Sequence, residues 1–157
     1  MDNLKKNNGK QHISVNAQYI KDLSFESPEA PFSLADKSTP KVELALDVKV
    51  EPLEEESSFE VSLKIQASAI RESKNIFIVE LIYAGVFTLE NIPQENQNAI
   101  LAIDCTSMIF PYARKIIADT TQSGGFQPLM IDPINFAALY RKKMLEQAQD
   151  NKAEQYN

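Results

Sequence analysis

One uninterrupted stretch in the middle of the chain, from Ile76 to Phe87, constrains the fold more than any other. β-branched and aromatic residues dominate it, which is typical of a β-strand. Both alternating sets of its positions are apolar, and only Glu80 breaks the pattern. Because an unpaired carboxylate is costly to bury, we expect one face of this strand to pack in the core. The other face is expected to stay open and acidic and to contact a partner.

Three earlier segments alternate between apolar and polar residues, which predicts strands with one buried and one exposed face. These segments are 13–26, 41–50 and 58–70. The residues between the first two, 27–40, include three prolines, so we expect a loop there. Short polar connections join the second and third segments to each other and to the stretch at 76–87. Such short connections indicate antiparallel hairpins.

In the C-terminal half the apolar spacing becomes helical. Pro93 suits the first turn of a helix, Pro111 is expected to kink or restart it, and the glycines at 124–125 are expected to end it. Asp132 and Pro133 are expected to be the N-cap and first residue of a last helix. Four strands followed by two or three helices predict an α+β fold, in which a four-stranded antiparallel sheet carries the C-terminal helices on one face.

The length of 157 residues predicts a single domain at 13–149, between flexible polar tails at 1–12 and 150–157. The 22 acidic and 16 basic residues give a net charge of -6, which disfavours nucleic acid or an anionic membrane as the partner. No stretch reaches the ~18–20 apolar residues of a membrane helix, and we expect no secretory signal. The single cysteine fits a reducing compartment, so we expect a cytoplasmic protein without direct membrane insertion.

Nothing in the sequence indicates catalysis. His12 is the only histidine and lies in the expected N-terminal tail. Cys105 lies on an apolar helical segment, where a buried and unreactive thiol is expected. The glycines at 124–125 lack the spacing of a phosphate-binding loop. We therefore expect no catalytic residue, no metal ligand and no cofactor, and the chain is not expected to be an enzyme.

If the four strands form one sheet, their alternation collects the polar residues on one outer face. That face mixes carboxylates, lysines and isoleucines: Asp22, Glu26, Glu43, Asp47, Glu60, Glu80, Lys41, Lys49, Lys64, Ile20, Ile78 and Ile82. Such a mixture predicts a docking surface for a basic or zinc-bearing partner. An ordinary solvated face with a few stray apolar residues is the alternative that the pattern leaves open.

Three blocks of the sequence resemble the SecB family, bacterial chaperones that keep secretory preproteins unfolded for export. Residues 19–26, with the proline-containing loop that follows, resemble the family's opening strand and loop. Phe110-Pro111-Tyr112-Ala113-Arg114 resembles its most recognisable helix motif. Residues 125–129 and 132–140 resemble its loop and final helix. The blocks follow one another in the family's order, and the resemblance spans residues 13–145.

The resemblance implies an ATP-independent chaperone, assembled as a homotetramer (a dimer of dimers), that delivers unfolded preproteins to the SecA ATPase. By position, the SecA-binding residues would be Asp22, Glu26, Ile78 and Glu80. The groove for unfolded preproteins would include Val42, Leu44, Leu46, Phe136, Leu139 and Tyr140. A SecB-like scaffold that holds one dedicated unstable partner, such as an antitoxin, is the alternative. Binding to several unrelated unfolded preproteins would distinguish the first interpretation from the second.

Overall fold

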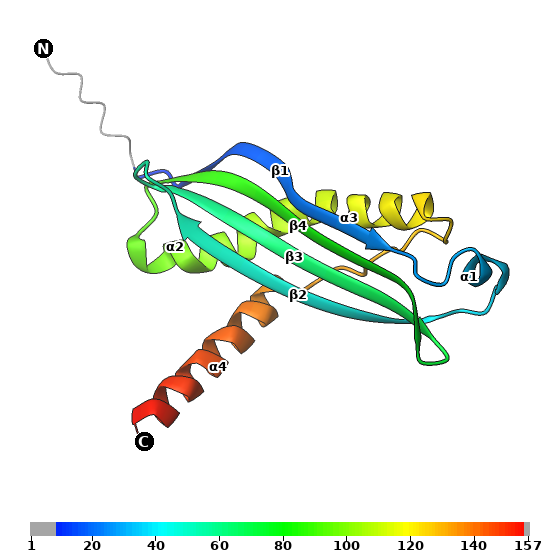
Figure 1. Ribbon diagram of the computed structural model, residues 1–157. Coiled ribbons are helices and arrows are strands. Elements are labelled where there is room, and N and C mark those ends of the chain that lie inside the picture. The colour runs from blue at the N-terminus through cyan, green and yellow to red at the C-terminus, as the bar shows by residue number, and fades with distance from the viewer. Residues whose placement is uncertain (1–8, 156–157) are drawn as a thin grey trace, which may run out of the picture.

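The structure, a computed structural model, describes residues 9–155 and contains one antiparallel sheet with helices on one side of it (Figure 1). Its strands are β1 (His12–Glu26), β2 (Lys41–Pro52), β3 (Ser58–Arg71) and β4 (Lys74–Glu90). They lie in the order β1-β4-β3-β2, so β4 and β3 are central while β1 and β2 form the two edges. The predicted α+β fold with a four-stranded antiparallel sheet is confirmed.

The helices follow the sheet in the chain. Helix α2 (Gln94–Ile100), a π-helical segment η1 (Leu101–Cys105) and α3 (Thr106–Ser123) succeed one another without a break behind the sheet (Figure 1). Helix α4 (Phe136–Gln155) extends away from the sheet, and the one-turn helix α1 (Phe32–Ala35) lies in the predicted loop at 27–40. Because α3 contains Pro111 and continues through it, the helix does not restart at this proline.

The core lies between the central strands and the helical segments η1 and α3. Alternate residues of β3 and β4 face the helices and are fully buried, among them Leu63, Ile65 and Leu81. Gly85 allows α3 to approach closely, since a Cβ atom there would lie 2.8 Å from the Phe87 ring and 3.2 Å from Ile109. Apolar burial on this face therefore holds the sheet and the long helix together.

Strand β1 has two irregularities in its pairing with β4, one after Val15 and one after Ile20. Each adds a residue, which reverses the faces taken by the side chains that follow. Between them, Tyr19 faces the outer side and Ile20 faces the helices. The prediction that Ile20 belongs to the outer face is therefore wrong, whereas Asp22 and Glu26 return to the outer face after the second irregularity.

The last helix begins later than predicted. Residues 131–135 form no regular secondary structure, and α4 begins at Phe136. The side-chain oxygen of Asn135 accepts a hydrogen bond from the backbone N–H of Ala138 at 3.0 Å, which is an N-capping contact. The prediction that Asp132 caps this helix is wrong, because an asparagine three residues later satisfies the free amide instead.

The two predicted tails are described only in part. Residues 1–8 of the predicted N-terminal tail lie outside the described residues, and His12, assigned to that tail, opens β1. In the predicted C-terminal tail, α4 continues to Gln155, and residues 156–157 lie outside the described residues.

Candidate functional site

The outer face of the sheet carries all six carboxylates predicted for it. Asp22 and Glu26 lie on β1, beside β4. Glu26 is directly opposite Ile78, and Ser24, between the two acidic residues, is directly opposite Glu80. The four residues predicted to dock a partner, Asp22, Glu26, Ile78 and Glu80, therefore share one patch on two adjacent strands. We call these four residues the docking patch.

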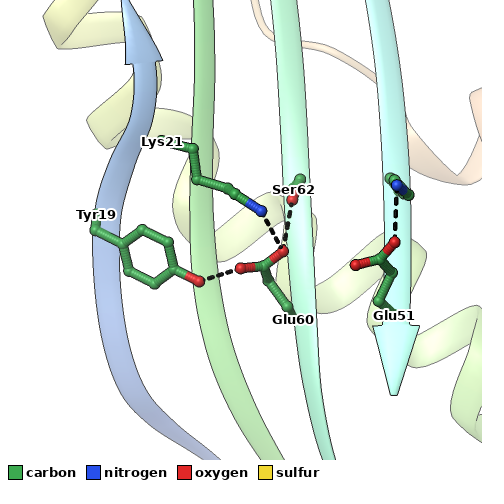
Figure 2. A network of polar contacts seen from close by, with 6 residues as sticks. Tyr19, Lys21, Glu51, Glu60 and Ser62 are labelled. Atoms are coloured by element: carbon green, nitrogen blue, oxygen red, sulfur yellow. Dashed lines mark hydrogen bonds and ion pairs between the residues drawn. The ribbon is translucent and has the colours of Figure 1, made fainter. Parts of the chain in front are cut away.

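A separate hydrogen-bonded network on the outer face is centred on Glu60 (Figure 2). Lys21 Nζ donates to Glu60 Oε1 at 2.8 Å, and the Tyr19 hydroxyl donates to Oε2. The hydrogen bond from Lys21, followed by that from Tyr19, lowers the pKa of Glu60. Burial, followed by the hydrogen bond to Glu60, raises the pKa of Tyr19 to about 12. Glu60 is thus an ionised carboxylate whose charge is neutralised within the chain.

The carboxylate next to this network is also neutralised by a lysine. Glu51 on β2 is directly opposite Glu60 on β3, an arrangement in which like charges repel. Lys49 relieves the repulsion, because its Nζ atom lies 2.7 Å from Glu51 Oε1. The hydrogen bond to Glu51 in turn raises the pKa of Lys49. Each of the two carboxylates at this end of the face has its own ammonium group.

The docking patch is compensated less completely. Within residues 9–155, no lysine or arginine forms an ion pair with Asp22 or Glu26. Glu80 has a partner, but Lys64 Nζ lies 3.6 Å from its Oε1 atom and both side chains are substantially exposed. Asp22 and Glu26 are therefore the carboxylates of this face that are best able to accept a cation from another molecule.

A cavity of about 510 Å³ lies on the other side of the sheet, between the β2 edge and α4. Four of the six residues predicted for the client groove line it, namely Leu46, Phe136, Leu139 and Tyr140. Val48 and Val50 of β2 complete its apolar wall. We call this space the β2–α4 cavity.

A second cavity, of about 630 Å³, lies where the loop after α1 meets the loop after α3. It is lined by Val42, another predicted groove residue, together with aromatic side chains from β4 and the second loop. The rings of Phe77 and Phe126 are 5.0 Å apart between centroids. Arg71 holds the first loop in place by donating from Nη2 to the Ser38 carbonyl at 2.5 Å. We call this space the loop cavity.

Strand β2 connects the two cavities. Val42, Leu44 and Leu46 point to the same side of the strand, and Leu44 lies between the cavities without lining either. Val42 is 41% exposed and Leu44 is 43% exposed, so this edge of the sheet presents apolar side chains to solvent. A line of apolar side chains between two cavities suits an extended polypeptide better than a compact ligand.

Sequence reasoning missed several residues of these cavities. Val48 and Val50 follow the same alternation as Leu46, so the strand pattern contained enough signal to find them. The sequence places Phe126 and Leu129 only in the loop at 125–129 that resembles the family's loop. Their position beside Phe77 depends on how that loop folds back on the sheet, which no periodicity reports.

The described residues show no arrangement suited to catalysis. Burial, and secondarily Asp104, raises the pKa of the Cys105 thiol to about 12, so the thiol is protonated and unreactive at neutral pH. Within residues 9–155, no group of three or more His, Cys, Asp or Glu side chains is placed to hold a metal ion. None of the helices in the same part of the chain is long and apolar enough to cross a membrane. The acidic patch and the apolar edge of the sheet are surfaces of a kind that suits contact with other polypeptides.

Comparison with known proteins identifies the family. The family described as preprotein translocase subunit SecB matches residues 6–147. A protein-export protein SecB from Rickettsia bellii is 56% identical over 92% of this chain and 95% of its own length. Another, from Rickettsia rickettsii, is 59% identical over 86% of this chain and 90% of its own length. The chain belongs to the SecB family, whose members are export chaperones and not enzymes.

A solved structure shows the same fold. The SecB-like chaperone of Mycobacterium tuberculosis, solved in complex with a peptide from the HigA1 antitoxin, superimposes with a TM-score of 0.65. The match covers 78% of this chain and 90% of that chain at 15% sequence identity, so the likeness concerns the fold alone. Because the relatives named for protein export are 56% and 59% identical, the alternative of a dedicated antitoxin scaffold is not favoured.

Proposed function

We propose that this chain holds unfolded secretory preproteins along β2 and α4 and delivers them to the SecA ATPase from the opposite face of the same sheet. The main support for this proposal is that the client-binding surface and the docking patch lie on different faces of the sheet. The two cavities, each lined by apolar and polar side chains, flank the helix-covered side of β2, whereas the docking patch lies on the outer side of β1 and β4. One molecule of this kind holds a client and a partner at the same time without either blocking the other.

Client binding rests on apolar burial. An unfolded preprotein presents scattered apolar side chains, and each gains roughly 25 cal/mol per Å² of apolar surface removed from water. Val42, Leu44 and Leu46 offer such contacts without hydrogen bonds that would select one side chain. Individual contacts are weak, but several grooves on one assembly raise the effective concentration of a long client. The proposed mechanism therefore needs no nucleotide.

SecA binding rests on charge. Asp22 and Glu26 lack a cation partner among the described residues, and Ile78 adds apolar area between the strands. A basic or zinc-bearing segment of SecA complements this combination. Glu60 faces the same side, but the hydrogen bond from Lys21 already satisfies it, so we place it outside the docking surface.

The assembly is proposed to be a cytoplasmic homotetramer, a dimer of dimers, of a single domain at 13–149. Apolar side chains on the edge strand β1 and on α3 are each at least 40% exposed: Val15, Ile20, Leu23, Met108 and Tyr112. Tyr112 stacks on Tyr83, which is directly opposite Ile20, so these side chains are neighbours. An edge strand beside an apolar helix face supports association of identical copies. Light scattering should give about four times the 17.7 kDa chain mass, and a stable monomer would contradict the tetramer.

The function is tested with purified protein and several unrelated preproteins. Each preprotein is diluted from denaturant without nucleotide, and its aggregation and folding are followed with and without the chaperone. We expect both processes to slow for all of them, and we expect added SecA to bind the chaperone–client complex. Protection of one partner only would instead support the dedicated scaffold.

A further inference from the structure

A largely buried arginine lines the loop cavity, and part of its guanidinium lacks an acceptor. The Arg71 side chain is only 13% exposed. Its Nη2 and Nη1 atoms donate to the carbonyls of Ser38 and Ser33 at 2.5 and 3.4 Å, and both of these acceptors are neutral. Its Nε atom donates no hydrogen bond to any residue of 9–155, whereas Nε of Arg114 donates to the Ile131 carbonyl at 2.7 Å. Because a buried charge is costly unless it is paired, Arg71 retains the capacity to bind an anion.

The carboxylate beside Arg71 is loosely placed. Asp36 Oδ2 lies 3.6 Å from Arg71 Nε, which is beyond hydrogen-bond distance, and the Asp36 side chain is 50% exposed. The other oxygen of Asp36, Oδ1, accepts hydrogen bonds from the backbone N–H of Ser38 at 2.9 Å and from its hydroxyl at 2.8 Å. These two hydrogen bonds are the main reason that the pKa of Asp36 lies below its ordinary value, and Arg71 contributes less. Asp36 therefore balances the charge of Arg71 without satisfying its Nε–H group.

The rest of the loop cavity suits a carboxylate that lies next to an apolar group. Lys37 lines the cavity together with Arg71, whereas Asp36 is the only acidic residue among the described residues that line it. The whole chain carries a net charge of -6, so this excess of cations is a local property of the cavity. The rings of Phe77 and Phe126 supply apolar surface beside the charges. An arginine fork matches the two oxygens of a carboxylate, so charge and shape favour the same ligand.

From this arrangement we infer that the loop cavity binds an aspartate or glutamate side chain of an unfolded client, which takes the place of Asp36 at the Arg71 guanidinium. The client carboxylate accepts the Nε–H hydrogen bond, and the half-exposed Asp36 side chain turns toward solvent. A neighbouring apolar side chain of the client contacts Phe77 and Phe126. A long unfolded chain carries many acidic side chains but a single terminal carboxylate, so a side chain is the usual ligand. The inference rests on the proposed function and adds to it a preference among apolar client segments for those beside an acidic residue.

The test compares two labelled peptides that differ in one group. Each is acetylated and amidated, contains leucines for the β2 edge, and includes either Phe-Ser-Glu or Phe-Ser-Gln. We expect the wild type to bind the glutamate peptide about five- to tenfold more tightly, since displacement of Asp36 offsets part of the gain from a hydrogen bond to a charged group. In Arg71→Gln the two peptides should bind alike. Lys74→Gln is the matched control, because it removes a positive charge directly opposite Arg71 in the same hairpin but lines neither cavity, and it should keep the preference.

A second variant is needed because Arg71 also holds the loop, so Arg71→Gln could act by disturbing it. Asp36→Asn removes the competing charge but still offers an oxygen to Ser38, and it should increase the preference for the glutamate peptide about twofold to fivefold. A direct readout is the NMR signal of the Arg71 Nε–H group. This signal should shift when the glutamate peptide is added and much less when the glutamine peptide is added.

The outcomes separate the carboxylate site from the proposed function. Equal binding of the two peptides to the wild type would overturn the carboxylate site and leave the client surface in place. A preference that persists in Arg71→Gln, or one that does not increase in Asp36→Asn, would also overturn it. If neither peptide binds the wild type, the client surface along β2 is wrong, and the carboxylate site fails with it.

Discussion

The two faces of the sheet differ in that one is buried against the helices and the other is exposed, so residues that are adjacent in the sequence have opposite environments. On β3, Leu63 and Ile65 are fully buried against the helices, while Lys64 between them is exposed on the outer face. On β2, Val42 lines the loop cavity while Glu43 faces outward. Because side chains of a strand alternate with period two, consecutive residues point to opposite faces of the sheet. One of them packs in the core or contacts a client, and the next lies on the face proposed for docking. Pairs of neighbouring residues therefore test this comparison most directly.

The largest expected effect comes from the core. Leu63→Ala removes a fully buried side chain and should lower the free energy of unfolding by about 2–5 kcal/mol. Lys64→Ala, one residue away on the open face, should change it by less than about 1 kcal/mol. Urea unfolding at one fixed protein concentration measures both, since association would otherwise shift the midpoint. Equal losses would contradict the assignment of the two faces.

A second pair of variants tests the client side. Leu44→Glu places a charge on the exposed apolar strip between the cavities and should weaken binding of an unfolded preprotein about tenfold. Ala45→Glu adds the same charge one residue later on the outer face and should leave client binding nearly unchanged. Titration with a labelled preprotein, after confirming assembly by light scattering, measures the difference. Equal weakening by both variants would indicate a general charge effect instead of a groove.

Alternation in the sequence was sufficient to predict the sheet and most of its faces. All four strands, the outer position of the carboxylates and the shared face of Val42, Leu44 and Leu46 follow from period two. The long helical region likewise follows from its apolar spacing. These features depend on neighbours in the sequence, which is why the sequence alone reveals them.

Features that depend on distant contacts could not be predicted in this way. The irregularities in β1 arise from its pairing with β4, and they moved Ile20 to the helix side. The start of α4 depends on Asn135, which satisfies an amide that Asp132 was expected to cap. The loop cavity needs Phe126 to fold back onto Phe77. In each case a tertiary contact decides between local alternatives of similar energy.

A third pair of variants compares the two ends of the outer face. Glu80→Lys reverses a charge of the docking patch and should weaken SecA binding about fivefold to tenfold, mainly through slower association at low salt. Glu51→Lys makes the same change at the internally neutralised end and should weaken SecA binding less than about twofold. Association rates at two salt concentrations provide the measurement. Comparable losses would show that SecA responds to net charge and not to the patch.

The smallest effect concerns the network that keeps Glu60 outside the docking surface. The pKa of Glu60 lies below its ordinary value of 4.5, first because Lys21 donates a hydrogen bond to it. A carboxylate of this kind stabilises the fold above its ordinary pKa, and the stabilisation is lost as the pH falls through the lowered value. At about pH 7, Glu60→Gln should therefore be less stable than the wild type by up to about 1 kcal/mol. The difference should shrink as the pH falls below 4.5.

Urea unfolding of both proteins across this pH range measures that difference. Asp22→Asn is the control on the same face, because Asp22 forms no ion pair with any residue of 9–155. A difference for Glu60→Gln that persists at acid pH would mean that Glu60 stabilises the fold by packing and not by its charge. In that event the internal neutralisation of Glu60 would no longer explain why docking is confined to the other carboxylates. The shape of the outer face, and not its charge, would then have to explain why SecA docks at one end of that face and not at the other.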